Sequence, residues 1–130
     1  MKRVTGIGGI FFKAEDPKKL TAWYGKHLGF NVQDWGVSFQ WLEVDKPEAK
    51  APATTAWSAF KAATDYFNPS EKPFMFNYRV ENLVELLKVL KEEGVQIVGE
   101  LQEFDYGKFA WIMDPEGNKI ELWEPKDDGF

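Results

Sequence analysis

The stretch that decides the fold is "TGIGGIFFKAEDPKKLTAWYGKHLGF", residues 5–30. Its first half alternates apolar side chains at every second position, which is typical of a β-strand. Asp16 is a good helix N-cap, Pro17 suits the first helical position, and Gly29 can end a helix in the left-handed conformation. The stretch therefore predicts a strand followed by a helix over residues 17–28.

The same pattern returns in "FMFNYRVENLVELLKVLKEEGVQI", residues 74–97. Its alternating aromatic residues again indicate a strand. Asn82 is placed to cap a helix, Glu85 completes a capping box, and Gly94 can end the helix. A second strand and helix are predicted here, with the helix over residues 83–93.

The two halves are related by an almost constant offset, because Asp16 and Asn82 are 66 positions apart and Gly29 and Gly94 are 65 apart. Three strand-like runs follow each predicted helix. These runs are "FNVQDW", "VSFQWLEV" and "TTAWSAFK" in the first half, and "VQIVGELQEF", "KFAWIMD" and "KIELWEP" in the second. We therefore expect one α+β domain over residues 1–130, made of two tandem β-α-β-β-β modules. Module one spans residues 1–63, module two spans 73–125, and residues 64–72 form the linker.

Composition limits the function classes. The chain has 130 residues, 16 Lys and Arg against 21 Asp and Glu, and a net charge of −5 without a basic run, which argues against a nucleic-acid partner. The absence of cysteine excludes a disulfide framework and a thiolate metal site. No signal peptide or membrane-spanning apolar run is present, so we expect no membrane partner and a cytoplasmic location. The 11 Phe, 6 Trp and 4 Tyr exceed what a small core needs and suggest a lined pocket.

Two motifs, "DPKKLTAWYGKHLGF" at residues 16–30 and "DPEGNKIELWEP" at residues 114–125, together with the internal repeat, resemble the vicinal oxygen chelate superfamily. That superfamily includes glyoxalase I, bleomycin-resistance proteins and extradiol dioxygenases. The resemblance implies that each module curls a mixed sheet around a cavity with the helices outside. It also implies a homodimer, and in many members four inward side chains that bind a divalent metal.

The resemblance places those four positions at Gly9, Thr55, Met75 and Glu121. Glu121 lies at the last ligand position, Gly9 precedes the first helix cap by seven residues, and the offset of 66 supplies the other two. Only Glu121 is a competent ligand for Zn²⁺, Fe²⁺ or Mn²⁺. We therefore expect no metal and no cofactor. His27, the only histidine, lies on the predicted outer helix and is expected to be structural or exposed.

Strand alternation then predicts an aromatic cavity with a few polar groups. For residues 38–41 the alternation does not decide which face points into the cavity. Phe39 and Trp41 share one face, Ser38 and Gln40 share the other, and we favour Ser38 and Gln40 inward. The aromatic side chains could instead fill a dimer interface or plug the cavity, and Arg79 could pair internally with Glu121. The predicted ligand-binding residues are Phe11, Trp57, Met75, Asn77, Arg79, Phe109, Trp111, Glu121 and Trp123.

The function that this pattern favours is metal-free binding of a small organic molecule, aromatic or amphipathic, as in bleomycin-resistance proteins. The alternative is a glyoxalase- or dioxygenase-like enzyme: a lyase, an isomerase or an oxidoreductase. In that enzyme Glu121 would be the catalytic base or a metal ligand, and Arg79 would stabilise a developing oxyanion. A third possibility is a structural or regulatory module whose dimer surface is its function.

Overall fold

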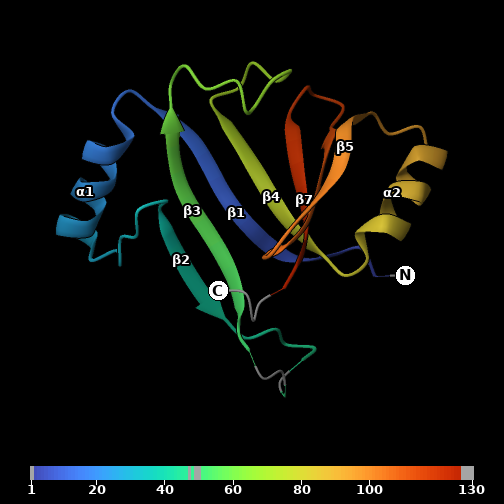
Figure 1. The fold of residues 1–130 in the computed structure, drawn as a ribbon, viewed down its shortest axis with the longest axis horizontal. Coiled ribbons are helices and arrows are strands. Elements are labelled where there is room, and N and C mark those ends of the chain that lie inside the picture. The colour runs from blue at the N-terminus through green and yellow to red at the C-terminus, as the bar shows by residue number, and fades with distance from the viewer. Residues whose placement is uncertain (1, 47, 49–50, 127–130) are drawn as a thin grey trace.

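The computed structural model describes residues 2–46, 48 and 51–126, which form one curved, open sheet with two helices (Figure 1). Every strand of the described ranges belongs to this sheet. In chain order the elements are β1 (Val4–Ala14), α1 (Pro17–Leu28), β2 (Val37–Trp41), β3 (Ala53–Lys61), β4 (Phe74–Val80), α2 (Leu83–Glu92), β5 (Ile97–Phe104), β6 (Gly107–Met113) and β7 (Lys119–Pro125).

The sheet is mixed, with the strand order β2-β3-β1-β4-β7-β6-β5. β1 pairs in parallel with β3, and β4 pairs in parallel with β7, whereas the two halves join through the antiparallel pair β1–β4. The predicted α+β fold with a mixed sheet is confirmed. The first predicted strand after α1, "FNVQDW", is wrong, because only a single bridge between Gln33 and Gly36 forms there.

The helix ends follow from local sequence, as predicted. The Asp16 side chain accepts a hydrogen bond from the Lys19 backbone N–H at 3.0 Å, and that of Asn82 accepts one from the Glu85 N–H at 3.2 Å. These caps satisfy N–H groups that have no partner within the first turn. Gly29 follows α1 with φ of 70°, a left-handed conformation that glycine adopts without strain.

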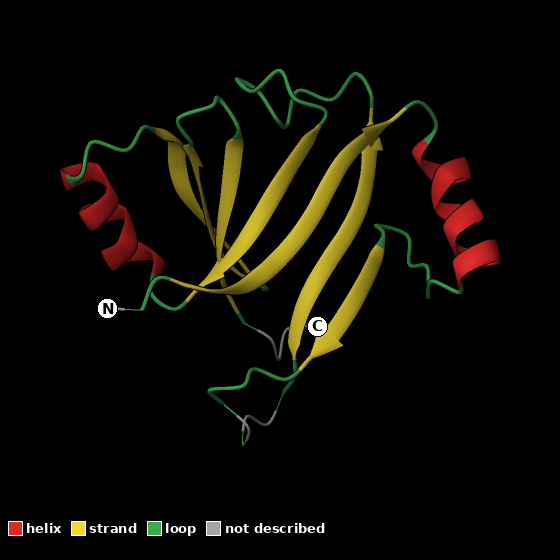
Figure 2. Ribbon diagram, turned by 180° about the vertical axis from the view of Figure 1, so that it is seen from behind, coloured by secondary structure: helices red, strands yellow, loops and turns green. Residues whose placement is uncertain are grey.

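The two helices lie on the outer flanks of the curved sheet, far from each other (Figures 1 and 2). They are packed unequally, since α2 buries Leu83, Leu86 and Leu90 against the sheet, whereas α1 has no fully buried residue. The main ring contact of α1 with the sheet is Tyr24 against Trp57, with centroids 4.8 Å apart. Within the described ranges, neither helix is long and apolar enough to cross a membrane.

The turn between β6 and β7 fixes the register of the last strand. The Asp114 carboxylate accepts hydrogen bonds from the Glu116 and Asn118 backbone N–H groups, each at 2.9 Å, and from the Asn118 side chain at 2.7 Å. These bonds, those from Asn118 first, lower the pKa of Asp114. Gly117 takes the left-handed conformation with φ of 81°. The turn is thus the "DPEGN" motif, and it sets Glu121 opposite Trp111.

The offset between equivalent residues of the two modules is not the same for the inner and the outer strands. Near the inner strands the offset is 66, because Asp16 and Asn82 each cap the helix that follows the inner strand of their module. On the outer strands, Ser58 lies beside Phe11 and Glu121 lies beside Asn77, and 121 − 58 = 63. The first module therefore has three extra residues between its inner and last strands. Because side chains alternate along a strand, an odd insertion reverses which face each residue of β3 occupies.

Candidate functional site

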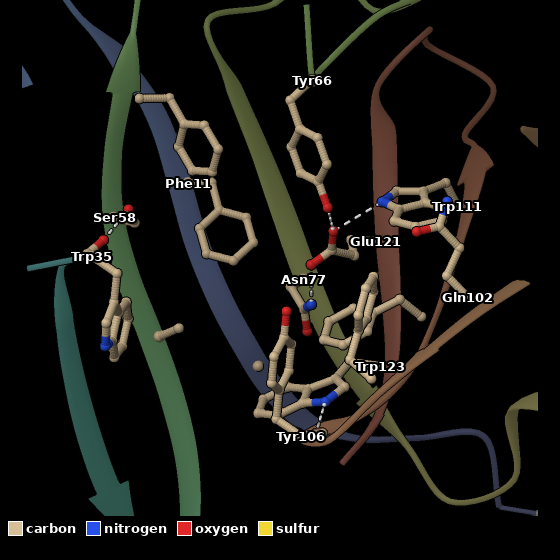
Figure 3. A pocket seen from close by; sticks show the side chains of 15 residues that line it. Phe11, Trp35, Ser58, Tyr66, Asn77, Gln102, Tyr106, Trp111, Glu121 and Trp123 are labelled. Atoms are coloured by element: carbon tan, nitrogen blue, oxygen red, sulfur yellow. Dashed lines mark hydrogen bonds between the residues drawn. The ribbon is translucent and has the colours of Figure 1, made fainter. Parts of the chain in front are cut away.

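A cavity of about 720 Å³ lies on the concave face of the sheet and is shared by both modules. Figure 3 shows side chains from β1, β3, β4, β5, β6 and β7 pointing into it, together with Tyr66 from the linker. Nine of its fifteen lining residues are aromatic, so the walls are mostly apolar. The lining residues are Gly8, Phe11, Trp35, Ala56, Ser58, Phe60, Tyr66, Asn77, Gln102, Phe104, Tyr106, Phe109, Trp111, Glu121 and Trp123.

Glu121 is the carboxylate of this cavity, and only 2% of its surface is exposed. Its Oε2 accepts hydrogen bonds from the Tyr66 hydroxyl and from the Trp111 indole N–H, the latter at 2.9 Å. Its Oε1 accepts one from the Asn77 amide nitrogen at 2.6 Å (Figure 3). All three donors are neutral groups, so they hold the carboxylate in place without supplying a counter-charge.

Tyr66 reaches Glu121 from the linker and is itself fixed by its neighbours. Its ring stacks on Phe60 with centroids 5.7 Å apart. Lys119 donates a hydrogen bond to the Tyr66 carbonyl oxygen at 2.7 Å, and its ammonium lies 5.7 Å from the Trp111 ring centroid. Burial, and then the negative charge of Glu121, raise the pKa of Tyr66, so its hydroxyl keeps its proton and remains a donor.

Asn77 presents an unused acceptor in the cavity. The residue is 1% exposed, and its amide nitrogen faces Glu121, because an amide oxygen would be repelled by the carboxylate there. Its Oδ1 has no hydrogen-bond partner among the described residues. Gly8, at the bulge of β1, lies against this oxygen, and a Cβ at that position would overlap it. The glycine therefore makes room for Oδ1 itself.

Arg79 was predicted to bind ligand, but it does not line the cavity, and the alternative pairing with Glu121 is not formed either. Instead of pairing with Glu121, its guanidinium donates to the Thr54 carbonyl oxygen at 3.1 Å and lies 3.5 Å from the Glu43 carboxylate. It also packs over the Trp123 ring, 5.2 Å from the centroid. Arg79 is thus buried behind the cavity wall rather than within the cavity.

Trp57 was expected in the cavity, and the structure places it on the opposite face of the sheet. Its ring packs against Phe12, Tyr24 and Phe30 on the side of α1, with centroids 4.8 to 5.2 Å apart. The cause is the offset of 63 on the outer strands, which makes Trp57 the counterpart of Ile120. The cavity instead receives Ala56, Ser58 and Phe60 from β3.

The remaining predicted site residues mostly come together. Met75 does not line the cavity but is fully buried beneath it, packed with Phe67 and the aromatic wall. Ser38 and Gln40 pair with Ala56 and Thr54, on the cavity-side face of β3, yet neither lines the cavity. The predicted residues that do line it are Phe11, Asn77, Phe109, Trp111, Glu121 and Trp123.

Sequence reasoning missed several lining residues, Tyr66 above all. Ser58 and Phe60 could have been found with an offset of 63, because they then match Glu121 and Trp123. Tyr66 lies in the linker, where no periodicity applies, so no sequence signal pointed to it. The other missed lining residues are Gly8, Trp35, Ala56, Gln102, Phe104 and Tyr106.

The four family positions do not fit a divalent metal. A side chain at Gly9 would meet the Phe11 ring, 2.6 Å from its Cβ. Ser58, the structural counterpart of Glu121, donates its hydroxyl to the Trp35 carbonyl oxygen at 2.7 Å. The Glu121 oxygens accept hydrogen bonds from three N–H and O–H donors, which are groups that cannot join the carboxylate as ligands of a metal ion. Across the described residues, no group of three or more His, Cys, Asp or Glu could hold a metal ion.

Comparisons with known proteins agree with this architecture. The model of the Glyoxalase/Bleomycin resistance protein/Dioxygenase superfamily matches residues 6–122. The uncharacterised protein YetH of Bacillus subtilis (strain 168) is 23% identical over 121 residues, covering 91% of this chain and 97% of YetH. The crystal structure of methylmalonyl-CoA epimerase from Mycobacterium tuberculosis is similar with a TM-score of 0.61 and 19% identity, over 98% of this chain and 93% of that one. A methylmalonyl-CoA epimerase in complex with methylmalonyl-CoA and NH4+ gives a TM-score of 0.66 and 11% identity, over 94% and 95%.

Proposed function

Because the chain belongs to the Glyoxalase/Bleomycin resistance protein/Dioxygenase superfamily, we propose that it is a binding member of that family, which holds a small organic molecule without a metal ion. The observation that carries the proposal is the aromatic cavity with its single fixed carboxylate, Glu121. Ligand sites typically have a volume of about 300–1,000 Å³, mostly apolar walls and a few convergent polar groups. The cavity of about 720 Å³ has each of these features.

The proposal predicts that a screen of aromatic and amphipathic compounds changes the tryptophan fluorescence in a saturable way. Trp35, Trp111 and Trp123 line the cavity, so a bound molecule alters their surroundings. Trp111→Phe should remove part of the change, whereas Trp23→Phe should leave it intact, because Trp23 lies half-exposed on α1. If no compound of a broad screen gives a saturable change, binding is rejected.

One observation favours the enzymatic alternative. The Tyr66 hydroxyl and the Glu121 carboxylate form a hydrogen-bonded pair at the cavity wall, and such a pair can accept and return a proton. The proposed reaction class is proton exchange at a carbon next to a carbonyl group. It is tested by incubating carbonyl compounds found in the screen in D₂O and following deuterium uptake by mass spectrometry. Uptake that is absent in Glu121→Gln supports catalysis, and no uptake above the buffer rate rejects it.

The proposal includes a homodimer, with the convex face of β1 and β4 as the contact. Ile10 and Phe76 pair there with 39% and 41% of their surfaces exposed, and Phe74 stacks on Phe76 at 5.1 Å. The helices on the outer flanks leave this central face uncovered (Figure 2). A second copy would bury these side chains, since burial of apolar surface drives association.

Sedimentation of the protein at micromolar concentration is therefore expected to give twice the chain mass of 15.0 kDa. Phe76→Asp should shift the protein to the monomer, because the charge would be buried at the contact. Val84→Asp is the matched control, since Val84 is 42% exposed but lies on α2, away from this face. A wild-type monomer, or equal effects of both variants, would contradict the proposed contact.

A further inference from the structure

The hydrogen-bonding groups around Glu121 show what a ligand must supply at that point of the cavity, an inference that rests on the proposed binding function. The side-chain donors around the carboxylate are already in use, since Tyr66, Trp111 and Asn77 all donate to Glu121. Farther along the wall the Trp123 indole N–H donates to the Tyr106 carbonyl oxygen at 2.9 Å. On the opposite wall the Ser58 hydroxyl is also engaged, at the Trp35 carbonyl oxygen.

The hydrogen-bond acceptors at this point, unlike the donors, are not all in use. Asn77 Oδ1 is buried without a hydrogen-bond partner among the described residues. Glu121 Oε1 accepts one hydrogen bond, from the Asn77 amide nitrogen, and a carboxylate oxygen can accept two. A buried acceptor without a donor costs free energy, so a ligand that brings donors to this point is favoured. The ligand group here should therefore be a donor.

The charge of the cavity favours a cationic donor. Among the fifteen lining residues Glu121 is the one carboxylic acid, and none of the fifteen is a Lys, Arg or His. The two nearby cations lie behind the walls with partners of their own. Lys119 donates to the Tyr66 carbonyl oxygen, and burial lowers its pKa, whereas Arg79 faces Glu43. Glu121 accepts hydrogen bonds from neutral donors, and the Lys119 ammonium acts on it only through a longer-range attraction, so a ligand cation in direct contact would gain free energy there.

The aromatic walls of the cavity can pack against the apolar part of such a ligand. The rings of Phe11 and Phe60 lie 5.5 Å apart on one side, and those of Phe109 and Trp123 stack at 5.8 Å on the other. Aromatic faces attract cations and also pack against flat apolar groups. We propose that the ligand is an organic cation, a protonated amine joined to an aromatic body, whose N–H groups bind Asn77 Oδ1 and Glu121 Oε1.

The test compares three probes that share one ring system: 1-naphthylmethylamine, 1-naphthalenemethanol and 1-naphthoate. At pH 7 they are a cation, a neutral donor and an anion. Isothermal titration calorimetry of the full chain should give an affinity for the amine at least tenfold higher than for the alcohol, and no measurable binding of the naphthoate. This comparison uses the wild-type protein, so it does not depend on whether a variant folds.

Glu121→Gln provides the second measurement, because it removes the charge but keeps the shape. The affinity for the amine should fall by 10- to 100-fold, and that for the alcohol by less than threefold. Glu92→Gln, the same change on the exposed side of α2, should alter neither. If the alcohol or the naphthoate binds as tightly as the amine, the ligand class is wrong while the proposed binding function stands. If no probe binds and the broad screen finds no ligand, the binding function itself is rejected.

Discussion

Glu121→Ala is expected to lower the free energy of unfolding by about 3 kcal/mol, although Glu121 lies at the wall of a cavity rather than in the apolar core. The change leaves three donors, on Tyr66, Trp111 and Asn77, without their acceptor. A hydrogen bond to a charged group contributes about 1.5–3 kcal/mol, and unpaired buried donors add a desolvation penalty. Water that enters the cavity recovers part of this loss, so the sum stays below three full bonds.

Urea unfolding followed by far-UV circular dichroism measures this effect without relying on tryptophan fluorescence. Glu121→Gln should cost less, about 1–2 kcal/mol, because one amide oxygen can still accept while the amide nitrogen faces a donor. The control is Glu92→Gln, at an exposed position of α2, with an expected change within about 0.5 kcal/mol. A Glu121→Ala variant as stable as the wild type would mean that the three donors do not depend on the carboxylate.

The helices could be predicted from the sequence because their signals are local. Each cap lies within three residues of the backbone group that it binds, as Asp16 and Asn82 show. The inner strands were also placed correctly, since β1 and β4 lead directly into helices whose caps fix the offset of 66. Local sequence signals were therefore enough to predict the fold class and to place Asn77 and Glu121 on inward faces of strands that prove to be neighbours in the sheet.

The outer strand of the first module could not be placed in the same way. From β1 to β3 the first module has three more residues than the second has from β4 to β7, and this odd number reverses the inward face of β3. The hydrogen-bond partners of Glu121 could not all be predicted from the sequence either. Tyr66 comes from the linker, 55 positions away in sequence, and a contact of that kind depends on the tertiary fold alone.

Gly8 and Gly9 show a second reason why the site could not be fully predicted from the sequence. The resemblance placed Gly9 at the first family ligand position, and strict alternation from Gly9 would turn Ile7 inward as well. A register shift between Ile7 and Gly9 instead turns Ile7 outward, with 51% of its surface exposed, and brings Gly8 into the cavity lining. Bulges add one residue to one strand, so strict alternation fails beyond them. The Asn77 amide oxygen fits against β1 because the residue at this irregularity is glycine, since a Cβ at Gly8 would lie 2.2 Å from it.

Trp57→Ala separates the structural tryptophan from those of the cavity. We expect the free energy of unfolding to fall by about 3–5 kcal/mol, the usual cost of removing a buried aromatic side chain. Trp57 is 9% exposed and packs against Tyr24 and Phe30. Because α1 has no fully buried residue of its own, its attachment to the sheet depends strongly on this contact.

In the same variant the affinity for a cavity ligand should stay within twofold of the wild type, measured by calorimetry below the unfolding transition. Trp57 lies on the far face of β3, so its removal leaves the lining residues Ala56 and Ser58 in place. Trp23→Ala is the matched control for stability, since Trp23 is 50% exposed on α1 and its loss should cost less than about 1 kcal/mol. If Trp57→Ala instead abolished binding with little loss of stability, the face assigned to β3 would be wrong. The insertion of three residues in module one would then no longer explain why the two halves of the cavity differ.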